Sequence, residues 1–119
     1  MILQKSDFYS TISFNATADH IAATVQINPE HAIFEGHFPG QPVVPGVCML
    51  QMVKELAEKA SEKKLQLRKV AQVKYLQVLV PKWDNPIRLQ IDWKDALSFA
   101  ATIQREEQII MKMSGQFEG

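Results

Sequence analysis

With 119 residues, the chain is long enough for one domain with a hydrophobic core of its own, and we expect a single domain over residues 1–119. The 13 basic residues balance the 13 acidic ones, and a formal net charge of zero argues against binding nucleic acid through its phosphates. Cys48 is the only cysteine, which excludes an intrachain disulfide framework and a thiolate zinc site. No segment has the ~18 consecutive apolar residues of a membrane span, so we expect a reducing, cytoplasmic setting.

The first half of the chain predicts a β-hairpin followed by a loop and one helix. Apolar and polar residues alternate over 7–15 and 20–27, where β-branched and aromatic residues are frequent, and this favours two strands joined by a turn. Asn28-Pro29 ends the second strand. From about Gly46 to Lys63, apolar residues recur at helical spacing along one face, which predicts a helix.

The second half predicts strands separated by short turns. Four segments have the composition of strands: 68–80, 85–94, 97–105 and 108–117. The first of them ends in consecutive apolar residues before Pro81, which is typical of a strand covered on both faces. A single helix followed by clustered strands with short connections favours an antiparallel α+β domain over a parallel one.

The loop between the hairpin and the helix is rich in proline and glycine. Pro39, Pro42 and Pro45 fix φ and lack an N–H group, so this loop is expected to be stiff. His37 lies within it, and histidine is the side chain best matched to proton transfer near neutral pH. The helix start at Gly46 offers backbone N–H groups to a carbonyl oxygen that gains negative charge. These residues predict proton abstraction beside a polarised carbonyl; the alternative for His37 is a core histidine bound to a loop carbonyl.

The same stretch carries a resemblance to a known family. The sequence GHFPG, followed by QPVVPGV and a helix, resembles the 3-hydroxyacyl-acyl-carrier-protein dehydratases of the FabZ and FabA type, and the match is tightest over 31–47. Those proteins have the hotdog fold, in which a curved antiparallel sheet, here of about five to six strands, wraps one long helix. They are dimers with the active site at the subunit interface. The resemblance therefore implies a homodimer or a larger assembly of dimers.

The resemblance also implies a reaction and roles for individual residues. His37 would remove the proton α to the thioester of a 3-hydroxyacyl chain, and the Gly46 amide would bind the thioester carbonyl. Phe38, Val44 and Val47 would bind the substrate. Loss of water would give a trans-2-enoyl thioester in fatty-acid or related acyl-chain biosynthesis. The partner would be an acyl carrier protein with a phosphopantetheine-linked acyl chain, and neither a metal nor a cofactor is expected.

One departure from the family pattern concerns the helix. The family has a carboxylate five positions after Gly46 and a glutamine four residues further on, whereas this chain has Gln51 and then Glu55. A glutamine amide donates and accepts hydrogen bonds but cannot deliver a proton. Because Gln51 lies between Cys48 and Met52, we expect it to be buried in an apolar setting and to need hydrogen-bond partners.

The exchange leaves the role of Glu55 and the activity open. The sequence favours a surface glutamate near Lys54 and Lys59. The alternative is a carboxylate that reaches the position of the family's acid, since one helical turn separates Glu55 from Gln51. The chain is accordingly interpreted as a dehydratase, slow if no acid replaces Gln51. The alternatives are a non-catalytic subunit that binds acyl carrier protein or an acyl thioester, and a hotdog thioesterase.

Basic residues are concentrated in one stretch. Residues 59–82 contain seven lysines and arginines and one acidic residue, Glu62. The stretch is interpreted either as a solvated surface or as a docking patch for an acidic partner such as acyl carrier protein.

Overall fold

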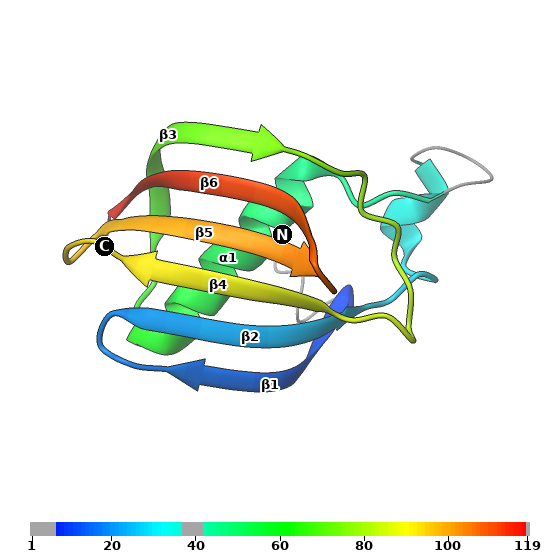
Figure 1. Cartoon of the computed structure of the whole chain (residues 1–119), viewed down its shortest axis with the longest axis horizontal. Coiled ribbons are helices and arrows are strands. Elements are labelled where there is room, and N and C mark those ends of the chain that lie inside the picture. The colour runs from blue at the N-terminus through cyan, green and yellow to red at the C-terminus, as the bar shows by residue number, and fades with distance from the viewer. Residues whose placement is uncertain (1–6, 37–41, 119) are drawn as a thin grey trace.

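The protein is described by a computed structural model that covers residues 7–36 and 42–118, so His37 and Phe38 lie outside the described residues. Within these described residues, six strands, one α-helix and one short 3₁₀ helix follow one another (Figure 1). Their bounds are β1 (Tyr9–Ala16), β2 (His20–Ile27), η1 (Ala32–Gly36), α1 (Gly46–Ser61), β3 (Gln66–Tyr75), β4 (Ile87–Trp93), β5 (Ser98–Arg105) and β6 (Gln108–Glu118).

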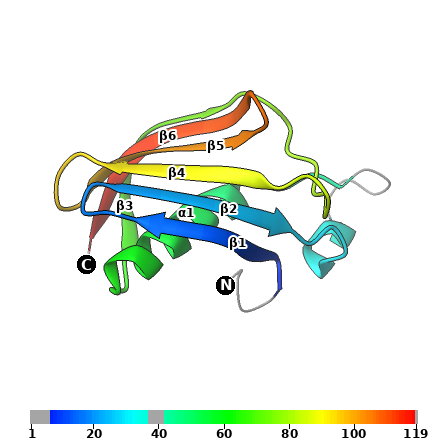
Figure 2. The ribbon, with the colours of Figure 1, turned by 60° about the horizontal axis from the view of Figure 1, so that its bottom comes forward.

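The strands form one antiparallel sheet with the order β1-β2-β4-β5-β6-β3. The sheet curves around α1, which covers one of its faces (Figure 2). The connection through α1 carries the chain from β2 to the far edge of the sheet, so that β1 and β3 form the two edges. This arrangement confirms the predicted α+β architecture of one helix wrapped by a curved antiparallel sheet.

The core lies between α1 and the concave face of the sheet. Every second residue of β2 is buried, as expected for a strand with one face against a core. The helix contributes Met52, Val53, Leu56 and Ala57, each 1% exposed or less. Burial of an aliphatic side chain of this size stabilises a fold by about 1.5–3 kcal/mol. The contact between α1 and the sheet therefore fixes the helix in place.

The helix begins where the sequence predicts and ends two residues early. Glu62 has a φ of 57°, in the left-handed region, and its N–H donates to the Glu58 carbonyl at 2.8 Å. This geometry closes the last turn, so Lys63 belongs to the connection to β3. No helix within the described residues has the length and apolar character required to cross a membrane.

The predicted strand over 68–80 is wrong at its C-terminal end. β3 stops at Tyr75, and the amides of Leu76 and Gln77 both donate to the Ile110 carbonyl, at 2.8 and 3.3 Å. The chain then leaves the sheet, and Val78 is 69% exposed within the protomer. Consecutive apolar residues are thus not buried here as a two-sided strand.

Gly115 of β6 is required by the close approach of β3. A Cβ atom on this residue would lie 2.4 Å from the Lys69 carbonyl oxygen, which is a backbone atom. The pairing of β3 with β6 is irregular on both sides of this point, with register shifts between Leu67 and Lys69 and between Val70 and Gln72. The irregular edge strand therefore depends on a glycine opposite it.

Gly115→Ala is expected to destabilise the fold by about 1–3 kcal/mol, because two paired strands must move apart to admit one methyl group. Chemical denaturation measures this change in the free energy of unfolding. Ser114→Ala, one residue away on the same strand, serves as the control and should change stability little. Equal stability of Gly115→Ala and the wild type would contradict the close approach.

Candidate functional site

The site predicted from the sequence begins at the first turn of α1. Pro45 precedes the helix in an extended conformation (φ −62°, ψ 147°), and proline has no side-chain group that caps a helix. Its carbonyl accepts hydrogen bonds from the amides of Cys48 and Met49, at 3.0 and 3.3 Å. The amides of Gly46 and Val47 come before these and have no acceptor within the helix. They are the donors that suit a developing oxyanion.

Tyr75, which sequence reasoning missed, packs against this helix start. A Cβ atom on Gly46 would lie 2.7 Å from the Tyr75 hydroxyl oxygen, so glycine makes room for the phenol ring. Burial raises the pKa of Tyr75 above its ordinary value. Only the position of Tyr75 at the end of β3 brings it here, and nothing in the sequence pattern marks it.

Val44 and Val47, which were both expected to bind the substrate, differ in burial. Val44 is 4% exposed, and its amide donates to the Leu79 carbonyl at 2.8 Å. Val47 is 72% exposed on the surface of the chain. Val44 therefore belongs to the wall between the loop and the core, whereas Val47 faces outward from the helix start.

Glu55 is buried, and its interpretation as a surface glutamate is wrong. Its side chain is 9% exposed, and its two carboxylate oxygens have different partners. The Tyr9 hydroxyl donates to Oε1 at 3.0 Å, and the Gln51 side-chain amide donates to Oε2 at 2.9 Å. Lys59, expected near the carboxylate, lies over the ring of Phe14 at 4.6 Å from the ring centre. Two neutral donors, Tyr9 and Gln51, thus bind the carboxylate inside the fold.

Gln51 is half-buried, less than its position between Cys48 and Met52 led us to expect, although both neighbours are buried. The expected hydrogen-bond partner is present, and it is Glu55 one turn further along the same helix. The two residues that are exchanged relative to the family pattern therefore contact each other directly.

Two neighbours of Glu55 are held in their protonated forms. Burial raises the pKa of Tyr9, and the charge of Glu55 and the hydrogen bond to it raise it further. Burial, and then the charge of Glu55, raise the pKa of the Cys48 thiol. A protonated, buried thiol is a poor nucleophile, and a phenol with a raised pKa remains a donor at neutral pH. Tyr9 and Cys48 are therefore poorly suited to exchange protons at neutral pH.

Tyr9 was also missed by sequence reasoning. It lies 46 positions before Glu55, at the start of β1, and reaches α1 because β1 forms the edge of the sheet that curves around the helix. A buried carboxylate needs donors, but the sequence favoured a surface position for Glu55 and so gave no reason to look for one. The identity of the donor depends on tertiary packing and was not available from the sequence.

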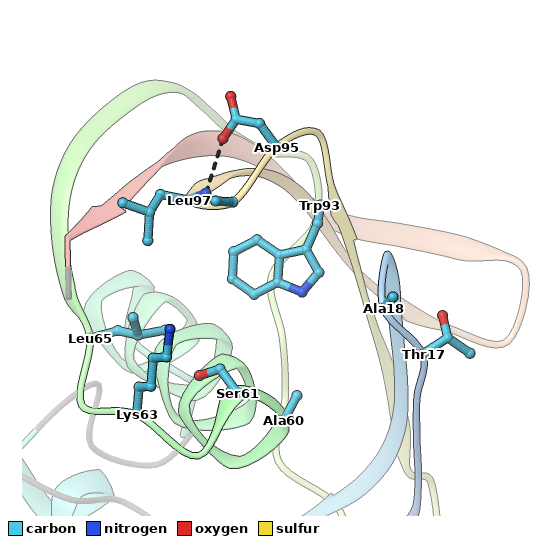
Figure 3. A pocket seen from close by; sticks show the side chains of 10 residues that line it. Thr17, Ala18, Ala60, Ser61, Lys63, Leu65, Trp93, Asp95 and Leu97 are labelled. Carbon is cyan, nitrogen blue, oxygen red and sulfur yellow. Dashed lines mark hydrogen bonds between the residues drawn. The ribbon is translucent and has the colours of Figure 1, made fainter.

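A separate pocket of about 260 Å³ lies at the other end of α1, between the helix end and Trp93 (Figure 3). Asp95 at its rim accepts hydrogen bonds from the amides of Leu97 and Ser98, at 3.0 and 2.7 Å. These bonds lower the pKa of Asp95 and hold the turn before β5. Asp95 thus stabilises this turn. In the described segments, no three His, Cys, Asp or Glu side chains gather as a metal site would require.

The basic stretch is divided between the two ends of the helix. Lys63 and Lys64 follow the end of α1, at the opposite end from the helix start. Lys74 and Lys82 flank the segment 76–80, which contacts Val44 beside the helix start. All four lysines are exposed. The stretch is therefore not one continuous patch at the candidate site.

Three known proteins illustrate what the chain is similar to. The 3-hydroxyacyl-[acyl-carrier-protein] dehydratase FabZ of Idiomarina loihiensis is 28% identical over 101 residues, which make up 84% of this chain and 65% of that protein. The chain thus spans slightly less than two thirds of that relative. The dehydratase heterocomplex ApeI:P from Xenorhabdus doucetiae contains a chain with a TM-score of 0.79 and 22% identity, covering 91% of this chain and 96% of that one. A hypothetical thioesterase with coenzyme A from Streptococcus pneumoniae has a TM-score of 0.61 and 11% identity, covering 95% of this chain and 88% of that one.

The similarity to solved structures confirms the predicted hotdog fold, which dehydratases and thioesterases share. The family comparison is more specific, because the model described as ApeI dehydratase matches residues 13–114. This match includes the loop motif, α1 and all strands except the first part of β1 and the last part of β6. The chain therefore belongs to the ApeI-like dehydratase family.

Proposed function

We propose that the protein dehydrates 3-hydroxyacyl thioesters carried on acyl carrier protein to trans-2-enoyl thioesters, in fatty-acid or related acyl-chain biosynthesis. Membership of a dehydratase family and the substrate in the name of the FabZ relative support this proposal. The observation that carries it is the buried Glu55 carboxyl group, which contacts Gln51 at the position of the family's acid. An acid is thus available within one helical turn of the place where the family pattern requires it.

In the proposed reaction, His37 takes the proton from the carbon α to the thioester. The electron pair left behind forms the double bond between the α and β carbons, while the bond from the β carbon to the hydroxyl oxygen breaks. The Gly46 amide donates a hydrogen bond to the thioester oxygen, where negative charge develops. Glu55, in its protonated form, gives a proton to the departing hydroxyl, which leaves as water and leaves the Glu55 carboxylate. Solvent later carries the proton from His37 back to that carboxylate. Gln51 orients the hydroxyl beside the carboxyl group.

Two other functions have specific support. The ApeI:P structure is described as a heterocomplex, which favours a subunit that acts together with a second chain. The similarity to a thioesterase fold favours hydrolysis. Mass spectrometry of 3-hydroxyacyl carrier proteins of several chain lengths, incubated with the protein, distinguishes loss of water, loss of the acyl chain and binding alone.

Exchanging the two helix residues tests the acid. Glu55→Gln removes the carboxyl group and should lower kcat by ~10²–10⁴, the usual contribution of a positioned acid. The double variant Gln51→Glu/Glu55→Gln restores the family's order and should regain most of the lost rate. Gln51→Glu alone places two carboxylates beside each other, which should lower the melting temperature through repulsion. Steady-state kinetics and thermal melting measure these effects.

His37→Ala is the control in the same assay, because no other side chain of the motif can take the α proton. It should abolish turnover in the wild type and in the double variant. A Glu55→Gln protein that retains the wild-type rate would show that His37 or water suffices as the acid.

The edge strand β3 supports the proposal of a dimer whose sheets join edge to edge. It lies at one edge of the sheet, and the residues that follow it expose apolar side chains. Leu76 is 51% exposed and Val78 is 69% exposed within the protomer. Exposed apolar residues that are contiguous in this way are typical of an interface.

Leu76→Asp/Val78→Asp should therefore shift the protein toward monomers, since association would bury two new charges. Sedimentation velocity at micromolar concentration measures the shift. Ile12→Asp is the matched control, because Ile12 is 53% exposed on β1, at the opposite edge of the sheet, and should leave the assembly intact. A wild type that is monomeric at this concentration would refute the dimer.

The position of the basic residues leads to a proposal for carrier-protein docking. Lys74→Glu/Lys82→Glu, near the helix start, should weaken binding of acyl carrier protein at low ionic strength, and the difference should fade with added salt. Lys63→Glu/Lys64→Glu changes the net charge equally at the other end of α1 and should have the smaller effect. Surface plasmon resonance measures both association rates. Equal effects of the two pairs would contradict a docking surface at the helix start.

A further inference from the structure

We propose that Tyr9 is a positioning residue of this enzyme, which holds the Glu55 carboxyl group in the orientation needed for proton transfer to the substrate. The inference rests on the dehydratase function proposed above. It adds a residue from β1 to the residues of α1 described above.

The two oxygens of Glu55 face in different directions. Oε1 accepts the hydrogen bond of the Tyr9 hydroxyl from β1, at 3.0 Å. Oε2 accepts the hydrogen bond of Gln51, which lies one turn nearer to the helix start, at 2.9 Å. The Gly46 amide, the expected donor to the thioester oxygen, lies at that same end of α1. The two bonds together hold the carboxyl group with Oε2 on the side of the helix start, and the bond from Tyr9 is the one that comes from outside the helix.

The hydroxyl of Tyr9 does more than fill space. The residue is 3% exposed, and its neighbour Phe8 is fully buried against Phe34, with ring centres 5.5 Å apart. A phenylalanine at position 9 would supply the same apolar ring, so packing alone does not require the hydroxyl. Thr11, two residues further along β1, has a buried hydroxyl oxygen without a hydrogen-bond partner among the described residues. Tyr9, in contrast, donates its hydroxyl to Glu55, which is the buried acid among the residues whose burial is described.

Tyr9 acts as a donor and does not exchange protons itself. Burial, together with the charge of Glu55 and the hydrogen bond to it, raises the pKa of Tyr9, so the phenol stays protonated at neutral pH. A group that always donates can hold a carboxyl group through the whole reaction cycle. Tyr9 therefore contributes through Glu55 and has no step of its own.

Kinetics test this dependence. Tyr9→Phe should lower kcat about tenfold with little change in KM, because an acid that is no longer oriented loses transition-state contacts. In the Glu55→Gln background, Tyr9→Phe should cause no further loss. Thr11→Val removes a hydroxyl of the same strand and should leave kcat unchanged. An equal loss from Tyr9→Phe in both backgrounds would overturn the proposal, because Tyr9 would then act without Glu55.

A second measurement does not depend on activity. Cys48 is the only cysteine, so ¹³C-labelled cysteine gives a single NMR signal whose titration reports the nearby charge of Glu55. Removing that charge in Glu55→Gln should lower the pH at the midpoint of the Cys48 titration. Tyr9→Phe should also lower it, because the carboxylate moves away from its place beside the thiol. An unchanged midpoint in Tyr9→Phe would overturn the proposal, since Glu55 would be held without Tyr9.

The kinetic and NMR measurements test the proposed dehydratase function and the proposed role of Tyr9 separately. If the wild type dehydrates no 3-hydroxyacyl substrate, the proposed function fails, while the Cys48 midpoint still decides whether Tyr9 orients Glu55. Melting temperatures of all variants show that the comparison is between folded proteins.

Discussion

The burial of the Glu55 carboxylate is the constraint on which the candidate site depends. A charge removed from water is tolerated only where donors replace its hydration, and removing one donor from a buried charged group costs about 1–3 kcal/mol or more. Tyr9 and Gln51 supply two such donors from two different elements. The fold therefore tolerates a buried acid because the packing of β1 against α1 places the Tyr9 hydroxyl beside Glu55.

The position of β1 relative to α1 depends in turn on the core. Apolar side chains of α1 interlock with alternate residues of the central strands, and the sheet curves so that its edge strand comes close to the helix. The curvature buries Tyr9 against α1, and a shift of the helix along its axis would separate the Tyr9 hydroxyl from Glu55. The same packing brings Tyr75 against Gly46 at the other edge. A tyrosine from each edge strand thus contacts the first three turns of α1.

Much of the fold could be predicted from the sequence, because periodicity reports which face of an element is buried. Alternation identified the hairpin of β1 and β2, and helical spacing identified α1. The error at residues 76–80 arose because a local apolar run looks the same whether it pairs as a strand or leaves the sheet. For the site, the loop motif indicated the family and the helix start, while the surface interpretation of Glu55 failed. Its burial is decided by β1, which is 46 residues away in sequence, and local patterns carry no information on such contacts.

The two bulges of β3 restrict where another strand can extend the sheet. Register shifts at Leu67–Lys69 and Val70–Gln72 twist the first half of this edge, and bulges of this kind protect exposed edges from uncontrolled strand addition. Regular backbone donors and acceptors remain only over the last part of the strand, from Gln72 to Tyr75. An added strand is thereby directed to the end of β3 that touches the start of α1. Any such neighbour would lie next to the candidate site and away from the rest of the edge.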